Sequence, residues 1–136
     1  MAPGGGDRLF LDANVLFSSA YLPVSEFLRL WQLPNTKLIT SDYAAEEARK
    51  NLKEQKQRER LRVLLREVEI VSAGPPNLVP PGIDLPVKDQ PILLAAIAAR
   101  ATHLITGDKK HFGRYFGRAV EGVMILPLSE YLAWRL

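Results

Sequence analysis

Five acidic residues of this sequence stand at positions from which they could hold a metal ion. Asp12 and Asp108 each follow a short apolar stretch, and Asp89 precedes a longer one. Glu46 and Glu47 lie early in a predicted helix. Carboxylates that converge in one pocket repel each other, which raises their pKa values and costs stability until a cation binds between them. With one or two Mg²⁺ ions, such a pocket can activate water for a displacement at a phosphate.

Each of these acids also has an ordinary structural interpretation. Asp89 fits the N-cap of the helix that follows it, and Asp108 fits a turn. The helix dipole alone would favour Glu46 and Glu47 near a helix start. Taken singly, Asp89 and Asp108 are more simply explained in this way. A purely structural role is harder to assign to Asp12, because an acid at the end of an apolar strand is a common device for phosphate and metal chemistry, although it also occurs in inert junctions between strands and helices.

Three polar residues near the aspartates have two interpretations as well. Asn14 either caps the first helix or reaches the pocket through its amide. Thr106 is either an ordinary strand residue or part of the site. His111 is expected to stack or to form a hydrogen bond locally rather than to bind metal.

The composition restricts the metal and the substrate. The chain has no cysteine and only two histidines, so we expect oxygen ligands, and carboxylates select hard ions such as Mg²⁺ or Mn²⁺. The net charge of +3 is modest, but Lys109, Lys110 and Arg114 come directly after Asp108. Cations beside a carboxylate pocket suit an anionic substrate, whose charge the carboxylates alone would repel. These three residues are therefore predicted to bind substrate.

The length and the hydropathy pattern predict one domain without a membrane span. We expect a flexible leader at residues 1–7 and a single domain at residues 8–136. The longest apolar run is far shorter than the roughly 20 residues that a bilayer requires. The opening MAPGGGDR does not resemble a secretory signal. These features predict a cytoplasmic protein.

Strands and helices alternate along the sequence. Strands are predicted at residues 8–11, 37–40, 69–72, 103–106 and 122–126, and helices at residues 13–20, 25–33, 42–52, 55–68, 89–101 and 129–136, with Ser25, Ser41 and Ser129 as caps. Five prolines make residues 74–86 a rigid loop. This alternation predicts a parallel sheet covered on both faces, whose ligands bind beyond the carboxyl ends of the strands, where the winding reverses. Asp12 and Asp108 would lie at that edge.

Four segments of the sequence resemble the motifs of the PIN-domain nucleases: FLDANVLFSS, TSDYAAEEARKNL, KDQPILLAAIAARATHLITGDKKHF and GVMILPLSEYL. The resemblance extends from Arg8 to Leu132, and it is closest to the small prokaryotic branch that includes toxins of toxin–antitoxin pairs. The pair KDQPIL and TGDKKHF is fairly specific, whereas the D-x-N motif alone would be weak.

The resemblance implies a fold, an activity and partners. The fold would be a three-layer α/β fold with a central parallel sheet of about five strands covered by helices on both faces. The activity would be an endoribonuclease that depends on Mg²⁺ or Mn²⁺. The partners would be RNA, an antitoxin protein and a second copy of the chain. Phe27 and Trp31 are candidates for a dimer interface, although we expect both in the core.

The resemblance also assigns roles by motif position. The catalytic set is Asp12, Glu47, Asp89 and Asp108, and the supporting set is Asn14, Thr106 and Glu46. The three aspartates would bind the metal or orient the attacking water. Glu47 is chosen over Glu46 as the helix acid because of the position of the family's glutamate relative to Leu52.

We therefore predict an endoribonuclease that hydrolyses RNA phosphodiesters through metal-activated water. One alternative is a non-catalytic RNA-binding or scaffold domain, which would retain RNA in the presence of a chelator without cleaving it. Another is a phosphatase or phosphorelay receiver with Asp12 as nucleophile. The DAN and TGD segments fit this second alternative poorly, because such chemistry usually requires a second acid beside the nucleophile or a lysine at a late strand end.

Overall fold

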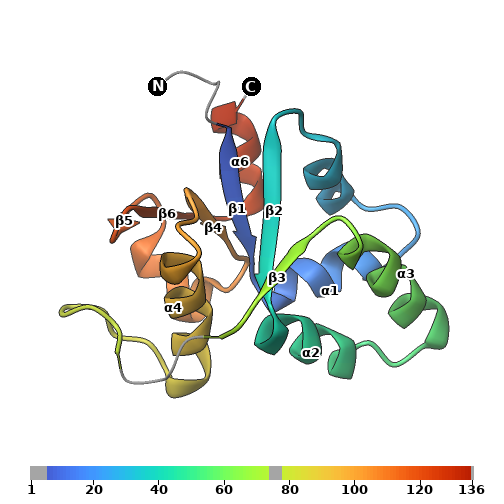
Figure 1. Ribbon diagram of the computed structural model, residues 1–136, viewed down its shortest axis with the longest axis horizontal. Coiled ribbons are helices and arrows are strands. Elements are labelled where there is room, and N and C mark those ends of the chain that lie inside the picture. The colour runs from blue at the N-terminus through green and yellow to red at the C-terminus, as the bar shows by residue number, and fades with distance from the viewer. Residues whose placement is uncertain (1–5, 74–77, 136) are drawn as a thin grey trace.

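A six-stranded β-sheet forms the centre of the protein (Figure 1). The computed structural model describes residues 6–73 and 78–135. The strands are β1 (Asp7–Leu11), β2 (Thr36–Ser41), β3 (Glu69–Val71), β4 (His103–Ile105), β5 (Ala119–Val120) and β6 (Val123–Leu126). Their order is β3-β2-β1-β4-β6-β5, and neighbouring strands are parallel except β5 and β6, which are antiparallel.

The winding of the sheet reverses between β1 and β4. From β1 the chain moves outwards through β2 to β3, and it then returns to place β4 on the other side of β1. Leu9 lies opposite His103 and Leu11 lies opposite Ile105. In sheets of this kind, a crevice opens beyond the carboxyl ends of the strands that flank the reversal. The residues directly after β1 and β4 are therefore placed to form a site.

Helices cover both faces of the sheet. Leu9, Phe10 and Leu11 of β1 are all fully buried, and neighbouring strand residues point to opposite faces, so both faces of β1 are covered. The α-helices are α1 (Ala13–Tyr21), α2 (Asp42–Asn51), α3 (Gln55–Leu65), α4 (Gln90–Ala98), α5 (Lys109–Phe112) and α6 (Leu128–Arg135). In Figure 1, α1, α2 and α3 lie together to the right of the central strands, and α4 lies to their left. None of the helices in residues 6–73 and 78–135 is long and apolar enough to cross a bilayer.

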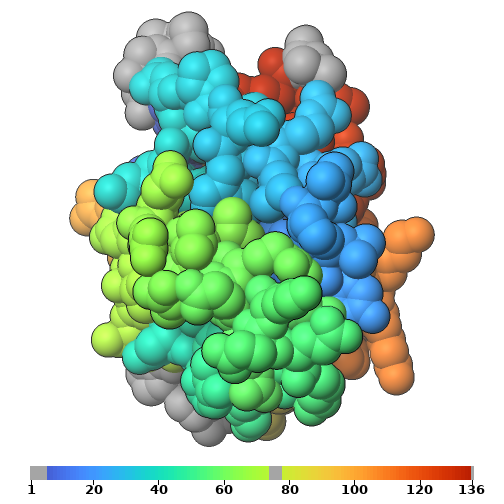
Figure 2. Space-filling model, turned by 90° about the vertical axis from the view of Figure 1, so that its right-hand side faces the viewer, coloured from blue at the N-terminus to red at the C-terminus, as the bar shows by residue number. Residues whose placement is uncertain are grey.

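The 3₁₀ segment η2 (Glu26–Gln32) follows α1 and packs against α3. Ser25 caps it as predicted, because the Ser25 hydroxyl oxygen accepts a hydrogen bond from the amide of Phe27. The Trp31 indole donates a 3.0 Å hydrogen bond to the carbonyl of Leu64 on α3. Figure 2 shows the surface that these segments form together. Phe27 and Trp31 are half-buried and pack against the core without belonging to its fully buried part.

The sequence predicts five of the six strands to within one residue at either end, but it does not predict β5. The sheet therefore has six strands rather than about five, and one of its edges is antiparallel. The strand β5 has only two residues and forms a tight hairpin with β6. Glu121 and Gly122 make the turn with φ angles of 49° and 86°. Glutamate is an unusual residue at such a position, where asparagine or aspartate normally precedes the glycine.

Several element ends also differ from the prediction. The helix α4 ends at Ala98 rather than near residue 101, and Arg100 beyond it has a φ of 56° that no helix can continue. Ser41 caps α2 as predicted, but α6 begins at Leu128, so Ser129 lies inside its first turn. Asp7 already belongs to β1. The other leader residues 1–5 and the loop residues 74–77 lie outside the described residues.

Candidate active site

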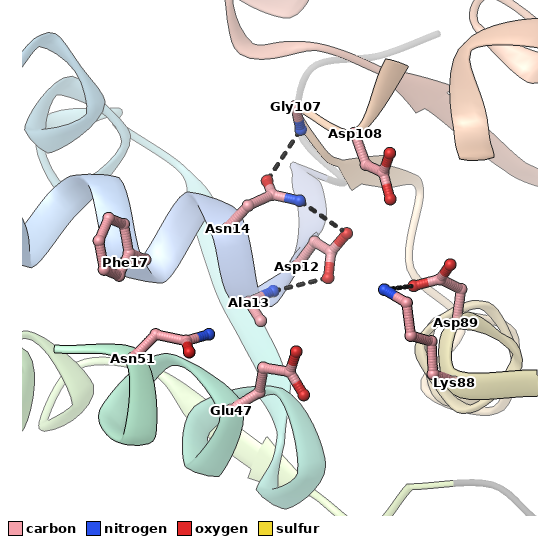
Figure 3. A pocket seen from close by; sticks show the side chains of 10 residues that line it. All are labelled: Asp12, Ala13, Asn14, Phe17, Glu47, Asn51, Lys88, Asp89, Gly107 and Asp108. Carbon is pink, nitrogen blue, oxygen red and sulfur yellow. Dashed lines mark hydrogen bonds and ion pairs between the residues drawn. The ribbon is translucent and has the colours of Figure 1, made fainter. Parts of the chain in front are cut away.

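A cleft opens at the carboxyl ends of β1 and β4, where the winding reverses (Figure 3). Its volume is about 450 Å³. The residues that line it are Asp12, Ala13, Asn14, Phe17, Glu47, Asn51, Lys88, Asp89, Gly107 and Asp108. They come from α1, α2, the 3₁₀ turn η3 (Val87–Asp89) and the loop after β4. The fold thus brings together the acids that the sequence places far apart.

Asp12 directly follows β1 and caps α1. Its Oδ1 accepts a 2.6 Å hydrogen bond from the amide of Ala13, and its Oδ2 accepts one of 2.8 Å from the hydroxyl of Thr106. The side-chain amide of Asn14 also donates to Oδ2, at 3.2 Å. Only 5% of Asp12 is exposed. These contacts hold the carboxylate in one orientation at the end of β1.

Asn14 and Thr106 link the loops that follow β1 and β4. The Asn14 Oδ1 accepts a 2.9 Å hydrogen bond from the amide of Gly107. The Thr106 hydroxyl oxygen, which is fully buried, accepts one of 3.1 Å from the amide of Asp108 while the hydroxyl donates to Asp12. Asn14 therefore belongs to the cleft through its amide rather than capping α1. Thr106 fixes the position of one aspartate loop relative to the other.

The pKa of Asp12 is raised from its usual value of 3.8 to about 6. Removal of the carboxylate from water is the largest cause. The hydrogen bonds from Thr106 and Ala13 oppose this effect, and the negative charges of Asp89 and Asp108 raise the pKa further. The folded protein thus disfavours the charged form of Asp12 unless positive charge enters the cleft.

Asp89 occupies the N-cap position of α4, but its side chain does not cap the helix. Its backbone angles are helical (φ −97°, ψ −14°), and it makes no cap hydrogen bond within the described part of the chain. The predicted capping role is therefore wrong, because η3 runs directly into α4 and leaves the carboxylate facing the cleft. Burial raises the pKa of Asp89, and the positive charge of Lys88, whose Nζ lies 3.6 Å from Oδ1, lowers it.

His111 lies between Asp89 and Asp108. Its Nδ1 is 2.9 Å from Oδ2 of Asp108 and 3.0 Å from Oδ2 of Asp89. Its backbone amide also donates to Asp108, which caps α5. The predicted local hydrogen bond of His111 is confirmed, and the spacing of three residues within one helical turn was the signal for it. The contact with Asp89 is not visible in the sequence, because it depends on how the tertiary fold places α5 relative to η3 (Val87–Asp89).

One oxygen of Asp89 indicates that a cation fits the cleft. Among the described residues, Oδ2 of Asp89 is a buried polar atom without a hydrogen-bond partner. His111 approaches it closely, but the single Nδ1 hydrogen is directed to Asp108. A buried carboxylate oxygen without a partner is costly unless a donor or a cation meets it. Together with the raised pKa of Asp12, this arrangement fits a divalent ion bound among the carboxylates.

The donor atoms of three residues form a compact group. Within the described residues, one donor atom each of Asp89, Asp108 and His111 lies within 4.8 Å of the other two. Asp12 faces the same cleft but is not part of this group, because hydrogen bonds hold its carboxylate at the end of β1. The structure thus brings the three predicted aspartates to one cleft and adds a nitrogen donor that was not predicted there.

Of the two candidate helix acids, Glu47 lines the cleft. Glu46 instead lies on the exposed surface of α2, where its Oε2 is 2.6 Å from Nη2 of Arg49. The hydrogen bond from Arg49 lowers the pKa of Glu46. The geometry is therefore in line with the choice of Glu47 as the helix acid.

Lys88 is the basic residue of the cleft lining, a position that the sequence did not predict. Lys109 and Lys110 are exposed on α5, and Arg114 lies 3.6 Å from Asp84 at the surface. These three residues are outside the cleft lining among the described residues. The neighbouring positions of Lys88 and Asp89 in the KD motif were the available signal. Substrate binding by the other three cations remains a prediction.

The Asp12→Asn variant tests the electrostatic cost of the cleft. With a chelator present, the unfolded chain loses the Asp12 proton near its usual pKa of 3.8, whereas the folded protein retains it up to about pH 6. Stability therefore falls as the pH rises through this window, because the folded state binds more protons. The shift corresponds to about 3 kcal/mol. We expect the free energy of unfolding of Asp12→Asn, relative to wild type, to rise by about 3 kcal/mol from about pH 3 to about pH 7.

Urea unfolding at several pH values in EDTA measures this difference. The exposed Asp84 provides a matched control, because Asp84→Asn changes the same functional group outside the cleft. A difference between Asp12→Asn and wild type that does not vary with pH would contradict the raised pKa.

Comparison with known proteins supports the fold. No family model and no curated protein matches the sequence. A solved structure that is similar is that of VapBC2 from Rickettsia felis bound to a DNA fragment from their promoter. The alignment has a TM-score of 0.64, covers 88% of this chain and 98% of the matched chain, and has 17% sequence identity. At this identity the likeness shows the fold alone, a PIN-like α/β fold with a central, mostly parallel sheet.

Proposed function

We propose that this protein is a divalent-metal-dependent endoribonuclease. The observation that carries the proposal is the cleft at the reversal of the sheet, which Asp12, Asp89 and Asp108 all line. The buried Oδ2 of Asp89, which has no hydrogen-bond partner within the described residues, is an acceptor that a cation in the cleft would satisfy. Nucleases use sites of this kind to hold ions beside the phosphodiester that they cleave.

Different residues of the cleft would hold the ion and orient the attacking water. A bound Mg²⁺ or Mn²⁺ ion supplies a water of lowered pKa and neutralises negative charge on the phosphate. Asp89 and Asp108 would hold the ion, since their oxygens belong to the compact donor group. Asp12 would accept a hydrogen bond from the attacking water with its remaining lone pairs and so orient it. Thr106 and Asn14 keep Asp12 in place for this role.

Positive charge near the cleft suits a nucleic acid. Lys88 lines the cleft with a largely exposed side chain, so its ammonium group would contact the phosphate that is cleaved. Lys109, Lys110 and Arg114 lie on the segment that follows Asp108 and would contact phosphates further along the strand. The sequence resemblance to PIN-domain nucleases supports RNA as the substrate.

An antitoxin protein is the proposed partner. The sequence resembles most closely the branch of PIN-domain nucleases that includes toxins of toxin–antitoxin pairs. The fold is similar to that of a chain in the VapBC2 structure. Both observations support a toxin whose cleavage of RNA is blocked by a second protein.

Replacement of the aspartates tests the nuclease activity. Asp12→Asn and Asp108→Asn should each lower the rate of RNA cleavage by more than about 100-fold, because each removes a charge that the ion or the attacking water requires. Cleavage of a labelled RNA is measured with Mg²⁺, with Mn²⁺ and with EDTA, and circular dichroism checks the fold of each variant. Unchanged cleavage in both variants would refute the proposal. RNA that is bound in EDTA but never cleaved with Mn²⁺ would support the scaffold alternative.

Glu46 and Glu47 form a matched pair for a second test, because they are adjacent on α2 and carry the same group. We expect Glu47→Gln to slow RNA cleavage about 10-fold or more, since its carboxylate faces the cleft. Glu46→Gln should leave the rate unchanged, since Glu46 is paired with Arg49 on the surface. Equal effects of the two substitutions, measured as single-turnover rates, would remove Glu47 from the site.

Expression in a bacterial host tests the proposed role as a toxin. Expression of the chain should arrest growth, whereas expression of the Asp108→Asn variant should not, because the variant cannot cleave RNA. The antitoxin would be sought among small proteins encoded beside this chain's gene; its co-expression should restore growth, and it should co-purify with the chain. Growth arrest that is equal for wild type and Asp108→Asn would contradict a toxicity based on cleavage.

A further inference from the structure

We propose that the imidazole of His111 is a nitrogen ligand of the metal ion in the cleft, and that it gives the site a preference for Mn²⁺ over Mg²⁺. The inference rests on the proposed metal-dependent function and deepens it. Carboxylates alone accept either ion, so a nitrogen donor would be the feature of this chain that distinguishes them.

The positions of the three donor atoms suit one ion. His111 Nδ1 lies 2.9 Å from Oδ2 of Asp108 and 3.0 Å from Oδ2 of Asp89. Neighbouring ligands of an octahedral ion, each about 2.1 Å from the metal, lie about 3 Å from each other. The nitrogen is thus separated from each carboxylate oxygen as adjacent ligands of one ion are.

Hydrogen bonds have a similar length, but they cannot satisfy all three groups. A ring nitrogen carries at most one hydrogen, and that of His111 Nδ1 is directed to Asp108. The buried Oδ2 of Asp89 is then left without a hydrogen bond in the described part of the chain. An ion in the place of that hydrogen would contact all three donor atoms at once. Ligation therefore accounts for the position of Asp89, which local pairing of His111 with Asp108 does not.

Binding of an ion requires that Nδ1 of His111 present its lone pair in place of a hydrogen. Beside a carboxylate, which accepts hydrogen bonds, Nδ1 carries a hydrogen. In the metal-bound protein the hydrogen would reside on Nε2, and Nδ1 would present its lone pair to the ion. The position of the ring is already fixed, because the His111 amide donates to Asp108 and the next residue, Phe112, is fully buried.

The ligand type determines which ion benefits. Mg²⁺ is bound by oxygen and loses its water reluctantly, whereas transition-metal ions accept imidazole nitrogen. We expect His111→Asn to weaken Mn²⁺ binding about 10-fold or more and to change Mg²⁺ binding much less. Isothermal titration calorimetry of the full-length protein with each ion measures both affinities.

Pulsed electron paramagnetic resonance of the Mn²⁺-loaded protein tests the ligation directly, because it detects the nitrogen nucleus of a coordinated imidazole. The chain contains only two histidines, and the second makes a matched control. His103 lies at the first residue of β4, at the end of the strand away from the cleft. We expect the nitrogen signal in wild type and in His103→Asn, and its loss in His111→Asn.

A wild-type spectrum without a nitrogen signal would overturn the inference, and so would a signal that persists in His111→Asn. Equal losses of Mn²⁺ and Mg²⁺ affinity in His111→Asn would also overturn it, because they would indicate that His111 only positions the aspartates. If His111→Asn does not fold, the wild-type spectrum decides. RNA cleavage that requires Asp12 and Asp108, found together with a spectrum lacking nitrogen, would overturn the role of His111 and leave the proposed function standing.

Discussion

The pairing of β1 with β4 is the interaction on which the candidate site depends. Phe10 lies opposite Leu104, and both side chains are fully buried. The hydrogen bonding between the two strands continues past the end of β1, because the Asp12 amide donates a 3.1 Å hydrogen bond to the carbonyl of Ile105. This bond places Asp12 beside Thr106. The geometry of the site therefore depends on a close-packed core, in which small displacements of side chains cost free energy.

Repulsion among the carboxylates acts against this framework. Burial favours the neutral forms of Asp12 and Asp89, and the charge of Asp108 adds to the effect on both. Hydrogen bonds from Thr106 and Ala13 to Asp12 offset only part of the cost. Proteins retain such unfavourable arrangements mainly at functional sites. The charge that lowers the stability of the metal-free fold is also the charge that would attract a divalent ion.

The sequence predicts the parts of the site that follow from strand ends. Asp12 and Asp108 each come directly after a strand pattern, and parallel strands bring their carboxyl ends to one edge. The sequence does not reveal that His111 reaches Asp89, or that Lys88 lines the cleft, because both depend on how helices pack across the reversal. The prediction that the Asp89 side chain caps α4 was wrong for a local reason. The same residue types can precede a helix either in an extended conformation, which allows a side-chain cap, or in a 3₁₀ turn, as here.

The acids of the cleft lie far apart in the sequence. Asp12 follows β1, and Asp108 comes after β4. Until β4 has joined β1, Asp12 has neither Thr106 to hold it nor Asp108 to face. A polypeptide still on the ribosome, or one shortened by a premature stop before β4, therefore carries no cleft. The cleft can therefore form only once the chain extends through β4 and the loop that carries Asp108.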